Sequence, residues 1–261
     1  MLKTKDWIYL DLEKTGGTFL TKKLVEIFSK KKFEKILKHS PQECIEKLPK
    51  IITIREPNTY YFSLWTYGLE KKGNFYKKIK RIYPIKADLF YAKKTKDSFS
   101  YFLDFALNYP LIKPNKNIYR FNSWIPGSSD VYTSRILRML IPKSEKKTFS
   151  EKIKSDLSLE SLNKHLINYI PEIILRTSSL NDDFYDYFKK NKLNFLNLPE
   201  DWEKIFPLNS LPINKSKFPS SLEKKSIPIE SYFSNYHKDL IKFKSKLSLL
   251  LIEKANSKLS E

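Results

Sequence analysis

A lysine followed by two glycines is the first feature of this sequence whose residue types could do chemistry. Lys14, Thr15, Gly16, Gly17 and Thr18 stand between a short apolar run and a segment with helical spacing. A helix N-terminus presents unpaired backbone N–H groups and the positive end of the helix dipole, so glycines just before it let an anion come close. The lysine adds a mobile cation, and the threonine hydroxyls can donate to phosphate or sulfate oxygens. The pattern therefore predicts an anion-binding loop.

This loop does not match the nucleotide triphosphatase pattern G-x-x-x-x-G-K-[ST]. Its lysine precedes both glycines, and no glycine stands upstream of it. The difference weakens an interpretation of the chain as a kinase or a GTPase.

Arg55 and Ser63 form a second pair with informative spacing. Arg55 follows the apolar, β-branched run 51–54, which predicts a buried strand that Pro57 ends. Ser63 stands eight residues after Arg55, in a segment with helical spacing. The chain thus offers a second strand-to-helix junction, with a cation at the end of the strand.

The order of strand, Lys-Thr-Gly-Gly-Thr and helix resembles the 5'-phosphosulfate loop of the sulfotransferases that use 3'-phosphoadenosine-5'-phosphosulfate (PAPS). The carbohydrate branch of that family often has Pro-Lys-Thr-Gly-Gly-Thr, whereas this chain has Glu13 in place of the proline. The family grips the 3'-phosphate with a strand-end arginine and a serine eight residues later, which is the spacing of Arg55 and Ser63. Tyr60 stands where many members carry a second arginine.

Three later segments also resemble the family. Residues 174–184 are similar to its late strand and helix, residues 211–216 to its late loop near the cofactor, and residues 232–243 to its C-terminal helix. The resemblance covers about residues 7–245 and is strongest in the first 65.

The resemblance implies an enzyme that moves the sulfuryl group of PAPS to a hydroxyl, with a carbohydrate as the expected acceptor. The products would be a sulfate ester and 3'-phosphoadenosine-5'-phosphate (PAP). Lys14 would stabilise the leaving group, and no metal ion is implied. The implied cofactor-binding residues are Lys14, Thr15, Gly16, Gly17, Thr18, Phe19, Arg55, Ser63, Lys215 and Ser216. The alternatives are a P-loop nucleotide kinase and a basic, non-enzymatic protein that binds polyanions.

Members of this family place their catalytic base between the loop helix and the arginine strand, where this chain has Glu34, His39, Glu43 and Glu46. We expect His39 to be the base, because the unperturbed pKa of histidine, about 6.5, suits proton abstraction near neutral pH. Glu43 is the next candidate. An ordinary surface histidine without a catalytic role is the competing interpretation of His39.

The elements that position these residues alternate between strand and helix. This alternation predicts an α/β fold, a three-layer sandwich with a central parallel sheet flanked by helices, similar to the P-loop NTPases. The expected strands are 7–12, 50–55 and 173–176. One expected helix starts at Thr18, and five others span residues 60–70, 100–108, 131–140, 181–190 and 232–251. Residues 1–261 are expected to form one domain, in which 71–140 is an irregular or helical substrate-facing insertion. Residues 71–98 in particular favour loops over a core element.

The composition limits the possible partners. The chain has 49 Lys and Arg against 29 Asp and Glu, a formal net charge of +20. Such a charge attracts polyanions, although lysines that are simply solvated are the competing interpretation. Together with the resemblance to the carbohydrate branch, the charge favours an acidic oligosaccharide or polysaccharide as acceptor, and we expect no nucleic acid. Protein tyrosine and a small alcohol stay open as acceptors. The single cysteine, Cys44, excludes an intramolecular disulfide, and the absence of clustered ligands predicts no metal site. No apolar run suits a signal sequence or a spanning helix, so we expect no stable membrane insertion and a cytoplasmic location.

Overall fold

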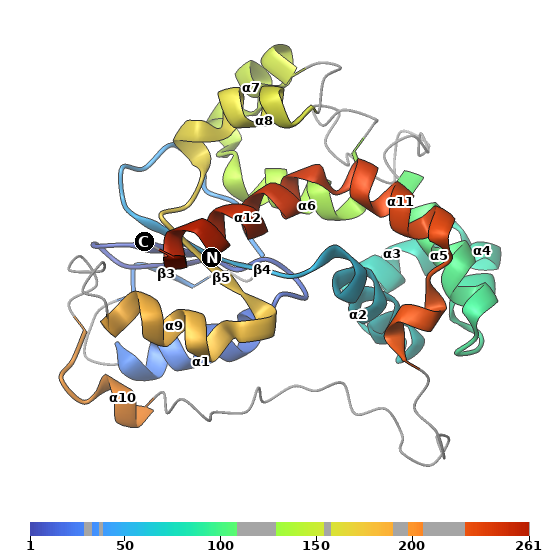
Figure 1. The fold of residues 1–261 in the computed structure, drawn as a ribbon, viewed down its shortest axis with the longest axis horizontal. Helices are drawn as coiled ribbons and strands as arrows, with labels where there is room; N and C mark the ends of the chain where they lie inside the picture. The colour runs from blue at the N-terminus through green and yellow to red at the C-terminus, as the bar shows by residue number, and fades with distance from the viewer. Residues whose placement is uncertain are drawn as a thin grey trace.

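The structure is a computed structural model that describes residues 1–28, 33–36, 39–108, 129–153, 158–189, 198–205 and 228–260. Within these residues, five strands form one sheet in the order β3-β1-β2-β4-β5. The strands are β1 Leu2–Lys3, β2 Ile8–Leu10, β3 Lys35–Ile36, β4 Lys50–Ile54 and β5 Ile173–Arg176. Helices lie on both faces of this sheet (Figure 1), so the protein has an α/β fold.

The sheet is mixed, which corrects the expectation of a parallel sheet. Strands β2, β4 and β5 are parallel neighbours, with Tyr9 opposite Ile51 and Ile52 opposite Ile174. Strand β1 instead runs antiparallel to both β2 and β3. The cause is a tight turn between β1 and β2, which reverses the direction of the chain. In this turn the N–H of Thr4 donates to the carbonyl oxygen of Trp7 at 3.0 Å.

The parallel strands are buried on both faces, and alternate residues contribute to two separate clusters of hydrophobic side chains. Tyr9, Ile51 and Ile173 pack with α1 (Gly17–Ile27) and α9 (Leu180–Lys189). Ile52 and Ile174 belong to the larger cluster, which includes α6 (Val131–Leu140) and α12 (Lys246–Ser260). This alternation follows from the two-residue period of a strand. Figure 1 shows α1 and α9 on one side of the sheet and α12 on the other.

The remaining helices pack beside the sheet or extend beyond it (Figure 1). They are α2 Pro57–Leu69, α3 Asn74–Ile82, α4 Pro84–Tyr91, α5 Lys96–Asn108, α7 Lys146–Ile153, α8 Leu159–Leu166, α10 Trp202–Ile205 and α11 Asn235–Lys244. Short 3-10 turns are η2 Lys143–Glu145, η3 Ile167–Tyr169, η4 Thr177–Ser179 and η7 Ile229–Tyr232. The expected strands at 50–55 and 173–176 and the expected helices at 60–70, 100–108, 131–140 and 181–190 are present, with boundaries shifted by up to four residues.

The segment 71–98 is not the irregular region that its composition suggested. Helices α3 and α4 occupy most of it, and they bury Phe75, Ile79, Ala87 and Phe90 in the larger cluster. The ring of Phe90 lies 5.2 Å from that of Phe105 on α5. These aromatic side chains therefore serve the core, whereas Lys77 and Lys80 on α3 are exposed.

The expected C-terminal helix over 232–251 is two helices. Helix α11 ends at Lys244 and α12 begins at Lys246, with Ser245 between them. The hydroxyl of Ser245 donates to the carboxylate of Asp130, a buried residue that also caps the N-terminus of α6. This bond to a residue distant in sequence fixes the point at which the helix breaks.

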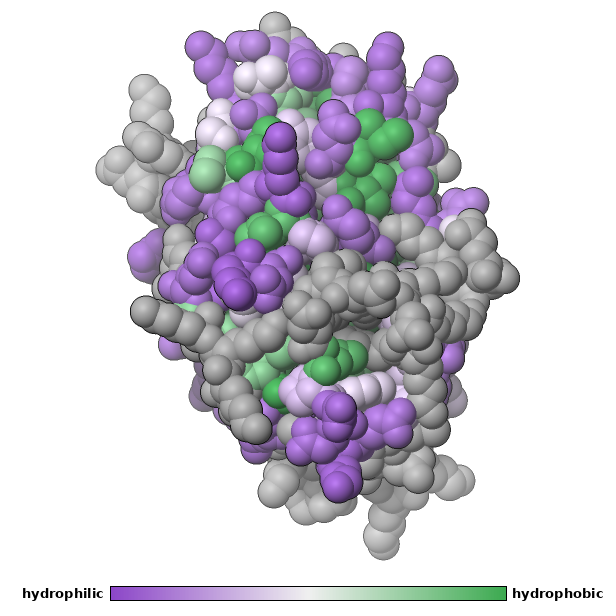
Figure 2. Space-filling view, turned by 90° about the vertical axis from the view of Figure 1, so that its left-hand side faces the viewer, coloured by the Kyte–Doolittle hydropathy of each residue, from purple (hydrophilic) through white to green (hydrophobic). Residues whose placement is uncertain are grey.

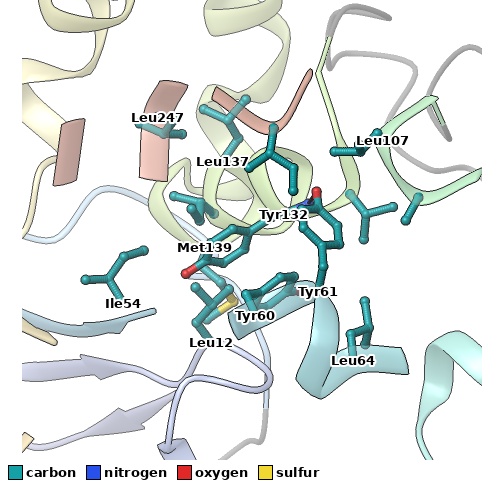
Figure 3. Close-up of a cluster of buried hydrophobic side chains, with 14 of the residues drawn as sticks. Leu12, Ile54, Tyr60, Tyr61, Leu64, Leu107, Tyr132, Leu137, Met139 and Leu247 are labelled. Carbon is teal, nitrogen blue, oxygen red and sulfur yellow. Dashed lines mark hydrogen bonds between the residues drawn. The ribbon is translucent and has the colours of Figure 1, made fainter. Parts of the chain in front are cut away.

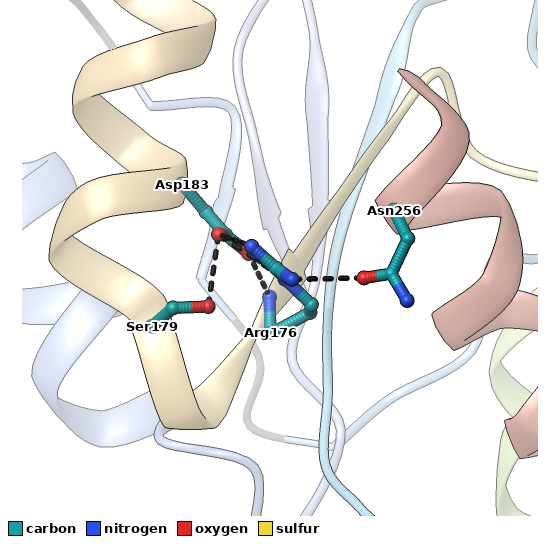
Figure 4. A network of polar contacts seen from close by, with 4 residues as sticks. All are labelled: Arg176, Ser179, Asp183 and Asn256. Atoms are coloured by element: carbon teal, nitrogen blue, oxygen red, sulfur yellow. Dashed lines mark hydrogen bonds and ion pairs between the residues drawn. The ribbon is translucent and has the colours of Figure 1, made fainter. Parts of the chain in front are cut away.

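Strand β5 is attached to helices on both faces of the sheet by one polar network (Figure 4). The guanidinium of Arg176 donates to both carboxylate oxygens of Asp183 on α9, at 3.2 and 2.5 Å for Oδ1 and 3.0 Å for Oδ2. It also donates to Oδ1 of Asn256 on α12 at 2.8 Å, while Ser179 donates to Asp183 at 2.9 Å. Asp183 is fully buried, so this pairing stabilises a charge that would otherwise be costly.

The surface contrasts with this apolar interior. On the face shown in Figure 2, hydrophilic side chains predominate and hydrophobic ones are visible only in smaller areas between them. None of the helices in the described ranges is long and apolar enough to cross a membrane.

Candidate functional site

The glycine loop follows β2 and leads directly into α1, as its sequence predicts. Gly16 has a φ of +84°, a left-handed conformation that glycine adopts without strain. The N–H groups of Phe19 and Leu20 both donate to the carbonyl oxygen of Gly16, at 3.0 and 3.1 Å. The N–H groups of Gly17 and Thr18 have no partner within the part of the chain that the structure describes. The start of α1 therefore presents two unpaired donors, which is the feature that binds anions.

Two of the expected ligands in this loop point inward. The hydroxyl of Thr15 is fully buried, donates to the carbonyl oxygen of Leu12 at 2.8 Å and lies 2.8 Å from the hydroxyl of Thr53. The side chain of Phe19 is buried in the cluster under α1. These side chains support the loop from inside, so the expectation that the Thr15 hydroxyl donates to a bound anion is corrected. Contact of Thr15 and Phe19 with a cofactor through their backbone stays a prediction. The exposed hydroxyl in the loop is that of Thr18.

Thr177 holds the loop against the sheet. Its hydroxyl lies 3.0 Å from the carbonyl oxygen of Thr15 and 2.9 Å from that of Ile54, at the end of β4. Leu180 closes the same side, because a Cβ placed on Gly16 would lie 3.5 Å from its Cδ2. The carboxyl end of β5 thus fixes the backbone of the loop, a role that the spacing of the residues did not reveal.

Lys14 lies in a partly buried position beside α2. Its Nζ is 3.8 Å from the ring centroid of Tyr67, within the range of a cation–π interaction. Burial lowers the pKa of Lys14 to about 8; Glu13 opposes this shift and the positive charge of Arg55 adds to it. The ammonium is therefore poorly solvated, and a bound anion would stabilise it.

Arg55 lies against the loop. Its Nη1 donates to the carbonyl oxygen of Lys14 at 3.3 Å, and its Nε donates to the hydroxyl of Thr59 at 3.1 Å. Its backbone N–H donates to the hydroxyl of Tyr132 at 2.9 Å. Burial lowers the pKa of Arg55 from its ordinary value. The two polar motifs of the sequence, separated by 41 positions along the chain at this contact, meet at one end of the sheet.

Ser63 lies on the face of α2 that faces both cations. Thr59, Ser63 and Tyr67 follow one another at intervals of four residues, so they share one side of the helix. Thr59 contacts Arg55, and Tyr67 contacts Lys14. Ser63, which is half-buried, therefore stands between these two contacts.

Glu13 and Tyr60, the two departures from the family pattern, share one partner in Arg135 on α6. The Nη2 of Arg135 lies 3.1 Å from Oε2 of Glu13, and its Nη1 donates to the hydroxyl of Tyr60 at 2.7 Å. The ring of Tyr60 stacks on that of Tyr132, with the two ring centroids 3.6 Å apart (Figure 3). Burial alone would lower the pKa of Arg135, but the charge of Glu13 and the Tyr60 hydroxyl raise it above its ordinary value. No motif surrounds Arg135, so the sequence alone does not indicate its role.

His39 lies beside the strand that carries the loop. Its Nδ1 is 3.0 Å from the carbonyl oxygen of Asp11 and 3.5 Å from the carboxylate Oδ2 of the same residue. Its φ of 51° is a conformation that residues other than glycine rarely adopt. Asp11 is buried, and a Cβ on Gly17 would lie 1.9 Å from its Oδ1. Asp11 therefore contacts both His39 and the first residue of α1.

The other candidates for a base are bound elsewhere. Glu34 and Glu46 both pair with Lys3 on β1, at 3.1 and 2.7 Å. Glu43 is exposed and pairs with Lys143 at 2.8 Å. Of the four candidates, the structure brings His39 next to Asp11, the residue that packs on the loop.

The remaining predictions about ligands stay predictions. Lys215 and Ser216 lie outside the described residues. Cys44 is a free, exposed thiol. The described part of the chain contains no group of three or more His, Cys, Asp or Glu side chains that could hold a metal ion.

Comparison with known proteins adds no relative: no protein-family model, no curated protein and no solved structure matches the chain.

Proposed function

We propose that the protein is a PAPS-dependent sulfotransferase with a P-loop fold, acting on a hydroxyl of a carbohydrate. The observation that carries the proposal is the contact between Arg55 and the glycine loop. This contact brings together the Arg55 guanidinium at the end of β4 and the two unpaired N–H groups at the N-terminus of α1. Ser63 lies nearby, one helical turn after Thr59, the residue whose hydroxyl Arg55 contacts. Such a set suits a nucleotide that carries phosphate at two separate positions.

In this proposal the cofactor lies across the carboxyl ends of β2 and β4. The N–H groups of Gly17 and Thr18 and the Thr18 hydroxyl bind its 5'-phosphosulfate. Arg55 and Ser63 bind its 3'-phosphate, with Arg55 held in place by Thr59. The residues Thr15 and Thr177 contribute indirectly, because they fix the loop backbone.

Sulfuryl transfer resembles phosphoryl transfer, in which positioning and electrostatic stabilisation supply most of the catalysis. The acceptor oxygen forms a bond to sulfur while the bond from sulfur to the bridging phosphate oxygen breaks. Negative charge develops on that bridging oxygen, which becomes part of the 5'-phosphate of PAP. The ammonium of Lys14 stabilises this charge in a partly buried site, where a cation acts more strongly than in water.

His39 removes the proton of the acceptor hydroxyl. A carbonyl oxygen only accepts hydrogen bonds, so the bond from Nδ1 to Asp11 requires the proton of the neutral imidazole to be on Nδ1. The other nitrogen, Nε2, is then left as the proton acceptor. The Asp11 carboxylate, 3.5 Å from Nδ1, stabilises the imidazolium that forms when Nε2 takes the proton.

Calorimetry with PAP and with ATP tests the proposal. A hydrogen bond to a charged group contributes roughly 1.5–3 kcal/mol, so we expect PAP to bind at least about 10-fold more tightly than ATP, in EDTA. Arg55→Ala should remove this preference, whereas the matched variant Arg81→Ala, at an exposed arginine on α3, should keep it. Equal affinity for both nucleotides, or a requirement for magnesium, would instead favour a nucleotide kinase.

A further inference from the structure

Tyr132 on α6 binds the backbone of Arg55 twice. Its hydroxyl accepts a hydrogen bond from the N–H of Arg55 at 2.9 Å and donates one to the carbonyl oxygen of Arg55 at 2.9 Å. Arg55 follows the last paired position of β4, where Ile54 stands opposite Arg176. The sheet therefore no longer holds the backbone at Arg55, and the tyrosine hydroxyl supplies the donor and the acceptor that a neighbouring strand would supply.

The aromatic ring of Tyr132 is itself held in place. The residue is fully buried, and its ring stacks on that of Tyr60 on α2. Its N–H donates to the hydroxyl of Tyr61 at 3.3 Å. Figure 3 shows the three rings gathered between α2 and α6. Burial raises the pKa of the Tyr132 hydroxyl well above its ordinary value, so the hydroxyl keeps the proton that it donates to Arg55.

The first turn of α6, which carries Tyr132, is anchored to a distant part of the chain. The carboxylate of Asp130 accepts from the N–H of Thr133 at 2.6 Å and from the hydroxyl of Ser245. The hydroxyl of Thr133 donates to the carbonyl oxygen of Lys244 at 3.2 Å. These bonds tie the turn to the junction of α11 and α12, so the position of Tyr132 is fixed independently of Arg55.

The side chain of Arg55 keeps donors for a ligand. Its Nε donates to the hydroxyl of Thr59, and its Nη1 donates to the carbonyl oxygen of Lys14. These two bonds leave Nη2 without a hydrogen-bond partner in the described part of the chain. The guanidinium can therefore still donate to an anion, and the direction in which it does so depends on where the backbone of Arg55 is held.

We propose that Tyr132 is a positioning residue for the 3'-phosphate: by holding the backbone of Arg55, it sets the direction from which the guanidinium meets that group. This inference rests on the proposed function for the identity of the ligand. The Tyr132 hydroxyl donates to and accepts from Arg55, and Tyr132 acts on the nucleotide only through that residue.

Calorimetry with PAP and with adenosine 5'-phosphate (AMP), which differ only in the 3'-phosphate, tests this role. Tyr132→Phe keeps the ring that stacks on Tyr60 and loses the hydroxyl. We expect PAP affinity to fall by about 10-fold, the effect of one hydrogen bond to a charged group, and AMP affinity to change by less than about 2-fold. Partial unfolding would lower both apparent affinities by the same factor, so the ratio of the two Kd values separates a misplaced Arg55 from a destabilised fold.

Two further variants show whether Tyr132 acts through Arg55. Arg55→Ala/Tyr132→Phe should bind PAP no more weakly than Arg55→Ala, because the hydroxyl has no effect once the guanidinium is gone. Tyr61→Phe is the matched control: it removes another buried hydroxyl, one that contacts the N–H of Tyr132, and should keep the preference for PAP over AMP.

The outcomes separate this role from the proposed function. A preference for PAP that survives in Tyr132→Phe would overturn the positioning role and leave the sulfotransferase assignment standing. Losses of PAP affinity that add up in Arg55→Ala/Tyr132→Phe would do the same. Equal binding of PAP and AMP by the unaltered protein would refute both.

Discussion

The charge of Lys14 should set the upper pH limit of activity. Its pKa is lowered to about 8 in the folded protein, chiefly by burial, so the ammonium loses its proton as pH rises through about 8. Only the protonated form stabilises the leaving oxygen in the proposed mechanism. We therefore expect kcat/KM, which reports groups of the free enzyme, to fall as pH rises through about 8, well below the ordinary lysine pKa of about 10.4.

Two variants test whether Lys14 causes this decline of kcat/KM at high pH. Lys14→Arg keeps a cation at all accessible pH values, so its kcat/KM should stay level through pH 9 even if it is lower overall. Lys78→Ala removes another lysine whose pKa burial lowers to about 8, and it should leave the decline in place. A profile that declines near pH 10 in the unaltered protein would contradict the role of Lys14.

His39 should contribute to turnover and not to cofactor affinity. General base catalysis contributes typically about 10²- to 10⁴-fold, so His39→Ala should lower kcat by this factor while the Kd for PAP stays unchanged. Asp11→Asn should lower kcat less, because the Asp11 carbonyl that accepts from Nδ1 remains. Glu43→Ala serves as the matched control, since Glu43 pairs with Lys143 on the surface. If Glu43→Ala loses activity and His39→Ala does not, the base is the carboxylate.

At the residue scale, the sequence predicted which positions gather but not which way each side chain points. The glycine loop, Arg55 and His39 are found at the ends of β2 and β4, because glycines, strand ends and helical spacing are local signals. Thr15 points inward since its hydroxyl pairs with Thr53, a partner 38 positions away. Arg135 could not be found from the sequence either, because its importance comes from contacts with Glu13 and Tyr60 that only folding creates.

At the scale of elements, the junction of β2 and α1 depends on the absence of a side chain at Gly17. A Cβ there would lie 1.9 Å from Oδ1 of Asp11 and 3.3 Å from the hydroxyl of Tyr9. Gly17→Ala should therefore displace the start of α1 or the Asp11 carboxylate. Overpacking of this kind typically destabilises a fold by about 1–3 kcal/mol. We also expect PAP affinity to fall, because the N–H groups of residues 17 and 18 move together.

Chemical denaturation and PAP calorimetry measure the two effects of Gly17→Ala. Thr18→Ala is the control: it changes the next residue, whose side chain is exposed, and should leave the free energy of unfolding nearly unchanged. Normal stability and normal PAP affinity in Gly17→Ala would show that Asp11 can turn away at no cost and that this close packing is dispensable.

The elements themselves were predicted where one local pattern dominates. The β-branched runs of β4 and β5 and the amphipathic spacing of α1 gave the right element at nearly the right residues. Strand β1 was missed, because two paired residues carry too little pattern to be recognised. The break at Ser245 was missed for a different reason, since it depends on the distant carboxylate of Asp130.

At the scale of the whole molecule, a formal net charge of +20 acts on stability as well as on partners. Like charges repel more strongly in the compact state than in the extended chain, so this excess of lysine and arginine destabilises the fold. Added salt weakens the repulsion, because the screening length falls from about 30 Å at 0.01 M to about 8 Å at 0.15 M. Pairing does not cancel the excess, since the chain has 49 basic residues for 29 acidic ones.

We therefore expect the Tm to rise when the NaCl concentration is raised from about 0.01 to 0.15 M. A domain of about 150–250 residues gains roughly 2–4 °C in Tm for each kcal/mol of added stability, so each kcal/mol of repulsion that is screened should raise the Tm by this amount. Differential scanning calorimetry at fixed pH measures this shift.

Chloride bound at the glycine loop could produce the same rise, so the experiment is repeated with Lys14→Ala/Arg55→Ala, which lacks the two cations of that site. General screening predicts nearly the same salt dependence in both proteins, whereas specific binding predicts that the variant loses most of it. A Tm that is constant or falls over this range would show that the positive charges are far enough apart, or well enough paired, to leave the fold unstrained.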